Sequence, residues 1–443
     1  MQGMITRREF TAALLPQLAR RERPNILWLI AEDNGPQWGC YRYPLVRTPN
    51  VDRLAASGEL FRHAFTPAPV CSPSRSAWNT GMYQTSIGAH HHRSHRDDGY
   101  RLPDGVQLVS DHLRAQGYFT ANVLQPAPGI RGTGKTDFNF QVERPFDGDH
   151  WNQRKPGQPF FAQVNFQATH KGPAFPEARK QGEVIDPAKV DLPPYWPDHP
   201  VVRDEFANYL DCVNLLDGKI GKVLEQLEKE GLAENTAVFF FGDNGRCLIR
   251  GKQWLYDAGI HVPLVVRWPG GVKPGTVRED LVSATDISAT ALWLAGAPLP
   301  EKMQGLPLYG SQANPRDAIF AARDRCDDTM DRIRAVRTAR YKLIRNDMPD
   351  RPYTQHNDYI ERQYPTLGAM KQLHAEGKLK GAETLFMQAR KPKLELYDVR
   401  NDPHEVRNLA ESAAHRGELQ KLSRMLDDWA AKFDPTIPET SIK

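Results

Sequence analysis

The stretch Asn25–Ala31 reads NILWLIA and runs directly into Glu32 and Asp33. An almost unbroken apolar run of this length predicts a strand buried on both faces, which is typical of a parallel sheet. Residues 236–241 (TAVFFF) have the same character. Further strands are expected over residues 119–124, 160–166 and 262–268.

Helical segments alternate with these strands. Thr48 and Pro49 form an N-cap and first-position pair. Apolar residues between 206 and 227 recur at helical intervals, which predicts a long amphipathic helix. Other helices are expected over residues 73–80, 106–116 and 284–295. The alternation predicts an α/β fold, in which a mainly parallel sheet is sandwiched by helices.

The C-terminal part has a different texture, because after about residue 330 Arg and Lys are frequent and apolar runs are short. A smaller α+β domain is indicated by a strand over 337–345, a helix near 367–376 and a final helix near 414–432. We therefore expect three parts: a leader over residues 1–23, a main domain over 24–330 and a C-terminal domain over 331–443.

The composition excludes several classes of protein. The 443 residues include 58 Lys and Arg against 54 Asp and Glu, a net charge of +4, which argues against a dedicated nucleic-acid binder. With 40% hydrophobic residues, a disordered chain is not expected. No apolar run approaches the length of a transmembrane helix, about 18 residues. The five cysteines include no CxxC pair, so neither a zinc ribbon nor a redox motif is expected.

Residues 6–10 read TRREF, a twin-arginine pattern of the kind that directs folded proteins out of the bacterial cytoplasm. The apolar stretch that follows is short and is broken by Pro16. The pattern favours a periplasmic or secreted protein, and the alternative is a plain basic leader.

Two of the predicted strands end in oxygen ligands. Glu32 and Asp33 follow the first, and Asp243 and Asn244 follow the strand at 236–241. In an open α/β sheet, ligands bind beyond the carboxyl ends of the strands, where these pairs can be neighbours. Three carboxylates and an amide oxygen suit Ca²⁺ or Mg²⁺ better than zinc. The alternative is that each pair caps a turn or a helix.

The predicted start of the helix over 73–80 is preceded by Cys71 and contains Arg75, in the sequence CSPSR. The N-terminus of a helix presents unpaired N–H groups to an anion, and a guanidinium adds fixed positive charge. Cys71 lies just ahead of both. The alternative is a buried structural cysteine beside a helix start.

This motif, followed by a small residue and Thr80-Gly81, resembles the signature of the type I sulfatases, members of the alkaline phosphatase superfamily. The resemblance covers residues 24–410 and implies an alkaline-phosphatase-like fold. It also implies hydrolysis of sulfate esters or sulfamates of sulfated carbohydrates. Other motifs stand in family order: both acidic strand ends, residues 48–54, Lys252 with Leu255-Tyr256, residues 262–264, residues 395–398 and Asp402-Pro403.

In that family the cysteine of the motif is oxidised to formylglycine. The resemblance therefore implies that a formylglycine-generating enzyme acts on Cys71, and that the hydrated aldehyde attacks the sulfur of the substrate with support from a divalent ion. By the same resemblance, one Ca²⁺ is bound by Glu32, Asp33, Asp243 and Asn244 together with the modified Cys71.

Other residues match positions that have roles in the family. Arg75 would hold the surroundings of residue 71. Lys135 and Lys252 would bind the sulfate, and His170 would be the acid for the leaving group.

Three features depart from the family pattern. Glu32 stands where the family usually has Asp, which keeps the carboxylate but changes its reach. Asp137 stands where the family commonly has His, and it would either serve as the base for the hydrated aldehyde or orient Lys135. The stretch between Thr120 and Lys135 is also longer than usual.

Two features bear on the substrate. Residues 346–349 and 393–409 resemble the heparan N-sulfatases (N-sulfoglucosamine sulfohydrolases), which points to N-sulfated glucosamine. A dense loop, expected to be cationic, contains His90, His91, His92 and His95 with Arg93 and Arg96. We expect it to contact an anionic glycan through His91 and His92, and the alternative is a solvated loop.

Two other functions fit the same residues. One is a phosphonate or phosphodiester hydrolase with the same machinery, which relative rates on sulfate and phosphate esters would separate. The other is a catalytically silent protein that binds sulfated glycan, whose binding would not depend on Cys71.

Overall fold

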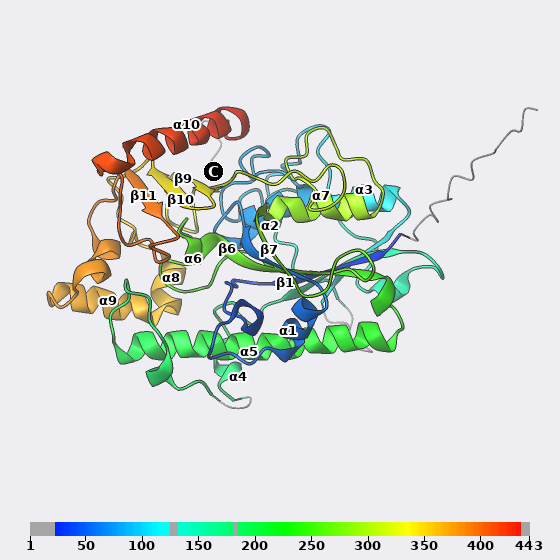
Figure 1. Cartoon of the computed structure of the whole chain (residues 1–443), viewed down its shortest axis with the longest axis horizontal. Helices are drawn as coiled ribbons and strands as arrows, with labels where there is room; N and C mark the ends of the chain where they lie inside the picture. The colour runs from blue at the N-terminus through cyan, green and yellow to red at the C-terminus, as the bar shows by residue number, and fades with distance from the viewer. Residues whose placement is uncertain (1–22, 125–131, 181–183, 436–443) are drawn as a thin grey trace, which may run out of the picture.

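A computed structural model describes residues 23–124, 132–180 and 184–435 (Figure 1). The twin-arginine pattern lies outside these residues. A sheet of seven strands crosses the middle of the molecule in the order β3-β4-β1-β5-β6-β2-β7. The strands are β1 Asn25–Ala31, β2 Glu59–Phe65, β3 Phe119–Val123, β4 Phe160–Phe166, β5 Thr236–Gly242, β6 His261–Arg267 and β7 Thr276–Ser283.

The sheet is mainly parallel. β1 pairs in parallel with β4 and β5, β3 with β4, and β2 with β7, whereas β6 runs antiparallel to β5 and β2. β1, β4 and β5 are buried along their whole length, as their continuous apolar sequences predict. The carboxyl ends of β1, β4 and β5 therefore meet at one edge of the sheet, and the candidate site lies there.

Helices cover both faces of this sheet (Figure 1). The helices on one face are α1 Pro49–Ala56, α4 Ala174–Ala178 and the long α5 Pro200–Lys229; those on the other face are α2 Cys71–Thr80, α3 Val109–Ala115 and α7 Ala284–Leu294. This arrangement confirms the predicted α/β sandwich. Within the described residues, no helix is long and apolar enough to cross a bilayer.

A second, antiparallel sheet has the order β11-β10-β9-β8. Its strands are β8 Ala318–Arg323, β9 Ile333–Thr338, β10 Tyr341–Asn346 and β11 Leu394–Asp398, and the helices of this region are α8 Asp358–Gln363, α9 Pro365–Ala375 and α10 Arg416–Phe433. α10 packs on β9 and β10 (Figure 1). Because β8 pairs with β9, a domain boundary at residue 330 would separate two paired strands.

Several predicted elements need correction. The single strand expected over 337–345 is a hairpin, β9 and β10, because the chain turns between Thr338 and Tyr341. α2 begins at Cys71 rather than Pro73, and α3 begins at Val109 rather than near 106. β2 and β7 were not predicted, because charged side chains interrupt both of their sequences, ELFRHAF and TVREDLVS.

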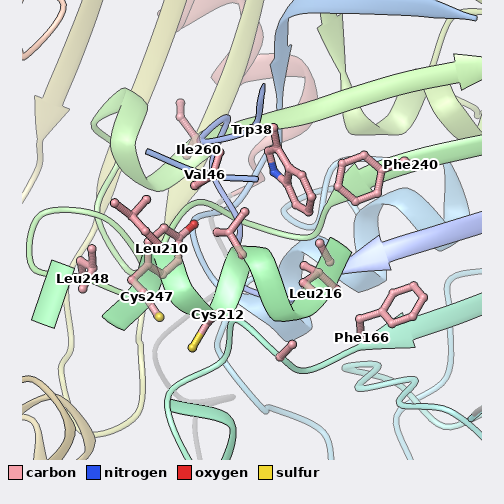
Figure 2. Packing of buried hydrophobic residues seen from close by; sticks show 14 of the residues in the cluster. Trp38, Val46, Phe166, Leu210, Cys212, Leu216, Phe240, Cys247, Leu248 and Ile260 are labelled. Atoms are coloured by element: carbon pink, nitrogen blue, oxygen red, sulfur yellow. The ribbon is translucent and has the colours of Figure 1, made fainter. Parts of the chain in front are cut away.

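The largest apolar core lies between α5 and the sheet (Figure 2). Trp38 meets Phe240 of β5 edge to face, with ring centroids 4.8 Å apart. Trp38 also donates a hydrogen bond from Nε1 to Asn34 Oδ1 at 2.7 Å, and this bond fixes the loop that follows Asp33. Cys212 and Cys247 are buried in the same cluster. Each large side chain buried here stabilises the fold by about 1.5–3 kcal/mol.

Candidate active site

The acidic ends of β1 and β5 are neighbours, because the two strands pair in parallel with Ala31 opposite Gly242. The backbone N–H of Asp33 donates to Asp243 Oδ1 at 2.8 Å, and Asn244 Nδ2 donates to Asp33 Oδ1 at 2.9 Å. Asp33 has a φ of 55°, a left-handed conformation that is uncommon for residues other than glycine but that Asp tolerates better than most. The parallel register therefore brings together two pairs that lie 210 residues apart in the chain.

The start of α2 is bound to the end of β5. The hydroxyl of Ser74 donates to the backbone carbonyl of Asp243 at 2.5 Å. The guanidinium of Arg75 approaches Asp243 Oδ2 through Nε at 3.0 Å and Nη2 at 2.9 Å, and its Nη1 donates to Asn165 Oδ1 at 2.6 Å. Cys71, at the first position of this helix, is fully buried. The cysteine and the acidic strand ends thus belong to one rigid unit.

The residues present fit a hard divalent cation. Ligand atoms of Glu32, Cys71 and Asp243 all lie within 4.8 Å of one another. Glu32 Oε2 and the carbonyl oxygen Oδ1 of Asn244 are buried and have no hydrogen-bond partner among the described residues, whereas buried polar atoms are normally satisfied. Burial raises the pKa of Asp243 to about 6. The positive charge of Arg75 opposes this shift, and the negative charge of Glu32 adds to it. A bound cation would satisfy the two free oxygens and favour the ionised carboxylates.

The thiol of Cys71 is poorly suited to act as a nucleophile in its unmodified form. Burial raises its pKa to about 12, although Lys135 and Lys252 lie close enough to oppose the shift. The thiolate, not the thiol, is the reactive form of cysteine. An unmodified Cys71 is therefore protonated and unreactive across the physiological range.

Lys135 lies against the first carboxylate of the site. Its ammonium pairs with Glu32 and lies 3.2 Å from Asp137 Oδ2. Asp137 also pairs with Arg96. Burial alone would raise the pKa of Asp137, but Lys135, Arg75 and Arg96 hold it far below its usual value. Asp137 thus remains ionised and is a weak base, which favours the role of orienting Lys135 over that of catalytic base.

Lys252 and His170 lie on the other side of the same carboxylates. Lys252 Nζ donates to Asp33 Oδ2 at 2.9 Å. His170 Nε2 lies 3.8 Å from Asp33 Oδ2 and 3.9 Å from Glu32 Oε1. Burial and the charge of Lys252 lower the pKa of His170, although both carboxylates raise it. Two lysines and a histidine therefore surround the acidic cluster, where each can contact an oxyanion.

The histidine-rich loop lies beside α2, because the backbone N–H of Arg93 donates to the Ser72 hydroxyl at 2.8 Å. His92 is buried, and its Nδ1 lies 2.8 Å from Asp327 Oδ1. Burial and His90 lower the pKa of His91 to about 4, and burial lowers that of His92. The expectation of cationic histidines is therefore revised: the arginines, not these two histidines, carry the positive charge of the loop.

Two further residues border the site: Asp327, in the loop between β8 and β9, and Tyr359 of α8. Asp327 accepts hydrogen bonds from Gln253 Nε2 at 2.9 Å as well as facing His92. The ring of Tyr359, on α8, lies 5.5 Å from Lys252 Nζ and 6.1 Å from the ring of His170. The Tyr359 hydroxyl is buried, and no residue in the described part of the chain forms a hydrogen bond with it. No motif marks either residue, because each is an ordinary loop or helix residue in a charge-rich segment.

Two family models match the chain. The model of the sulfatase family matches residues 24–132 and 147–297. A second, described as N-sulphoglucosamine sulphohydrolase, C-terminal, matches residues 248–361. The second match includes both Asp327 and Tyr359.

Relatives and solved structures agree with these matches. The chain is 33% identical to an ulvan-active sulfatase of Formosa agariphila, over 96% of this chain and 78% of that protein. It is 28% identical to the N-sulphoglucosamine sulphohydrolase of Homo sapiens, over 92% of this chain and 90% of that protein.

Two solved structures share the fold. The phosphonate monoester hydrolase of Agrobacterium radiobacter has a TM-score of 0.69 at 18% identity, covering 93% of this chain and 96% of that chain. A protein in complex with its substrate D-glucosamine-2-N,6-O-disulfate has a TM-score of 0.66 at 17% identity, covering 95% and 100%. These likenesses confirm the fold expected from the sequence, and they carry no argument about the substrate.

Proposed function

The chain belongs to the sulfatase family and is a sulfuric ester hydrolase, and on that premise we propose that it removes sulfate groups from sulfated carbohydrates, using a modified residue 71 and a bound Ca²⁺. One observation carries the proposal. Cys71, Glu32 and Asp243 offer ligand atoms to one point, and Lys135 and Lys252 pair with the same acidic cluster. This combination provides a nucleophile position, a cation site and an oxyanion site together.

The modification and the cation supply the chemistry that the thiol lacks. We propose that Cys71 is converted by a formylglycine-generating enzyme, because its own thiol is buried and protonated. The hydrated aldehyde would then supply a hydroxyl nucleophile at residue 71. The cation, when bound, lowers the cost of placing negative charge at that hydroxyl and polarises a sulfate oxygen.

The residues of the chain then bind and orient the substrate. Lys135 and Lys252 would weaken their ion pairs with the carboxylates and contact the sulfate oxygens. Their positive charges would then balance the negative charge that develops on these oxygens. Arg75 would keep Asp243 ionised and in place through its two contacts with Oδ2. His170 would donate a proton to the atom that leaves the sulfur, with the nearby carboxylates of Glu32 and Asp33 favouring its protonated form against burial and Lys252.

We assign the substrate to the sulfated polysaccharides or their fragments. This rests on the two relatives, whose names concern ulvan and N-sulphoglucosamine. It also rests on Arg93 and Arg96, whose side chains are 52% and 40% exposed beside the start of α2. Polymers of this kind are extracellular, so we propose that the enzyme acts in the periplasm or outside the cell.

Sulfate release from a panel of sugars tests the proposal. The enzyme would be co-expressed with a formylglycine-generating enzyme and supplied with Ca²⁺, N-sulfated glucosamine, O-sulfated sugars and ulvan fragments. Cys71→Ala is the negative variant, and Cys40→Ala, which alters a half-buried cysteine elsewhere, is its matched control.

Release that depends on Cys71 but not on Cys40 supports the sulfatase and identifies the linkage. Release confined to O-sulfates would rule out the N-sulfatase assignment. No release from any sugar, with the aldehyde verified at residue 71, would overturn the proposal and turn attention to phosphonate and phosphate esters or to a silent binding protein.

A further inference from the structure

A cavity of about 170 Å³ lies next to the loops that follow β1 and β5, outside the candidate active site. It is lined by residues of these two loops and of the loop after β11, so both sheets contribute to it. Its lining includes Gln37, Tyr195, Arg246, Arg250, Tyr256 and His404. None of these residues belongs to the site described above.

Arg246 is the unusual member of this lining. It is only 8% exposed, yet it donates a single side-chain hydrogen bond within the described part of the chain, from Nη2 to the Tyr195 hydroxyl at 2.6 Å. Its Nε is buried with no acceptor. A guanidinium carries several N–H donors and no acceptor, and buried donors are normally satisfied. Arg246 therefore has buried N–H groups that form no hydrogen bond with the described residues.

The charges around the cavity are not balanced. Across residues 23–124, 132–180 and 184–435, no carboxylate forms an ion pair with Arg246 or Arg250. The two acidic residues of the lining are already paired with other cations: Asp257 with Lys342 and Arg337, and Glu405 with Lys342. Arg246 thus remains without a carboxylate partner among these residues, whereas Glu405 helps to raise the pKa of Arg250 and so favours its charged form. A buried charge without a partner is costly unless something offsets it.

Aromatic rings hold both guanidinium groups in place. Arg246 lies over the ring of Trp196 at 5.1 Å, and Arg250 lies over the ring of Tyr256 at 3.6 Å. Stacking covers the flat face of a guanidinium and leaves its N–H edge available for an acceptor. Arg250 uses this edge to donate to the backbone carbonyls of His404 and Glu405. Within the described residues, Arg246 donates only to the Tyr195 hydroxyl, so the rest of its N–H edge remains available.

We propose that this cavity is a second, non-catalytic oxyanion site, in which Arg246 binds a sulfate group. The ligand chemistry is that of a compact oxyanion with several acceptor oxygens, which matches a guanidinium edge. Sulfate has two sources in the proposed reaction: the free ion that is released, and a sulfate group still attached to the carbohydrate. The site goes beyond the proposed function, because binding here needs neither the modified residue 71 nor the bound cation.

Isothermal titration of the full-length protein with sodium sulfate, against sodium chloride at the same ionic strength, tests the proposal. The Cys71→Ala protein is used, so that turnover plays no part. Arg246→Gln removes the charge, and we expect sulfate to bind at the cavity about tenfold more weakly or worse. The matched control is Arg154→Gln, because Arg154 also stacks on an aromatic ring, Phe160 at 5.3 Å, but does not line the cavity.

A second variant tests the same site in case Arg246→Gln does not fold. His404 is exposed and lines the cavity, so His404→Asp should leave the fold intact. The new carboxylate would compete with sulfate for the guanidinium groups. We expect this variant to lose sulfate binding in the same way as Arg246→Gln. Sulfate that binds at the active site is expected to remain in both variants and to weaken in Lys252→Gln, which separates the two sites.

A parallel titration with a sulfated oligosaccharide distinguishes the two sources. If Arg246→Gln and His404→Asp bind both ligands more weakly, the site accepts sulfate that is still attached to the sugar. If they bind only the free ion more weakly, the site accepts the released product. Unchanged binding of both ligands in both variants would overturn the proposal. This failure would leave the sulfatase assignment intact, because that assignment depends on Cys71-dependent sulfate release.

Discussion

Arg75 and Asp243 form an ion pair with no exposure on either side chain, with Nη2 2.9 Å and Nε 3.0 Å from Oδ2. The pair joins the helix that begins with Cys71 to the strand end that would hold the cation. Its removal would leave an uncompensated charge in the interior, which is more costly than the loss of a surface pair.

We therefore predict that Arg75→Gln lowers the free energy of unfolding by about 3–5 kcal/mol and abolishes activity. Urea denaturation followed by fluorescence measures the change. The matched control is Arg340→Gln, which breaks the pair with Asp398 at 2.7 Å, where Arg340 is 47% exposed. That variant should cost less than about 1 kcal/mol. Equal effects of the two variants would contradict the structural role given to Arg75.

Calcium should stabilise the folded protein whether or not residue 71 is modified. A ligand that binds only the native state at one hundred times its Kd adds about 2.7 kcal/mol to the free energy of unfolding. We expect chelation to lower Tm in the wild type and Glu32→Gln to abolish most of this response, because Glu32 has a free buried oxygen. Glu234→Gln, at a side chain that is 82% exposed, should retain it. Differential scanning fluorimetry with and without Ca²⁺ measures the change in Tm. A wild-type Tm that does not change with Ca²⁺ would refute the cation site.

Asp327 is expected to fix the orientation of His92. Because Asp327 Oδ1 faces His92 Nδ1, the proton resides on Nδ1 and the buried Nε2 is left as an acceptor without a partner. We predict that Asp327→Asn lowers kcat/KM about tenfold. Asp98→Asn breaks a similar contact of 2.7 Å to His95 in the same loop, but at an exposed side chain, and should have little effect. The ¹⁵N shifts of His92 should show the tautomer change in Asp327→Asn; an unchanged tautomer would contradict this account.

Tyr359 should contribute to substrate binding. Within residues 23–124, 132–180 and 184–435 its hydroxyl forms no hydrogen bond, and its ring lies beside Lys252 and His170. We predict that Tyr359→Phe raises KM about fivefold with little change in kcat, because the substrate loses one hydrogen bond. Tyr364→Phe removes another unpartnered hydroxyl, on a fully buried ring, and should leave both constants unchanged. If the two variants behave alike, Tyr359 has no role in binding.

The central sheet and most of the candidate site could be predicted because their signals are local. β1 and β5 are continuous apolar runs that end in oxygen ligands, and parallel pairing makes such ends neighbours. β2 and β7 escaped prediction because Arg62, His63 and the charged residues of β7 hide their apolar positions. These strands lie at one end of the sheet, where side chains can reach solvent.

The remaining parts of the site depend on tertiary contacts that leave no local mark. Asp327 lies in the loop between β8 and β9 of the second sheet, and Tyr359 lies on α8, so both are far in sequence from Cys71. The charge state of the histidine loop also depends on burial, which turned an expected cationic patch into neutral histidines with arginines between them. Neither effect can be read from residue type or spacing alone.

The central claim is that residue 71 in its aldehyde form is the nucleophile of a sulfatase. The most direct test measures specific activity for sulfate release against the fraction of aldehyde at residue 71, determined by mass spectrometry of the same samples. Co-expression with different amounts of a formylglycine-generating enzyme varies that fraction. The account predicts a straight line through zero; full activity in protein that retains the Cys71 thiol would contradict it.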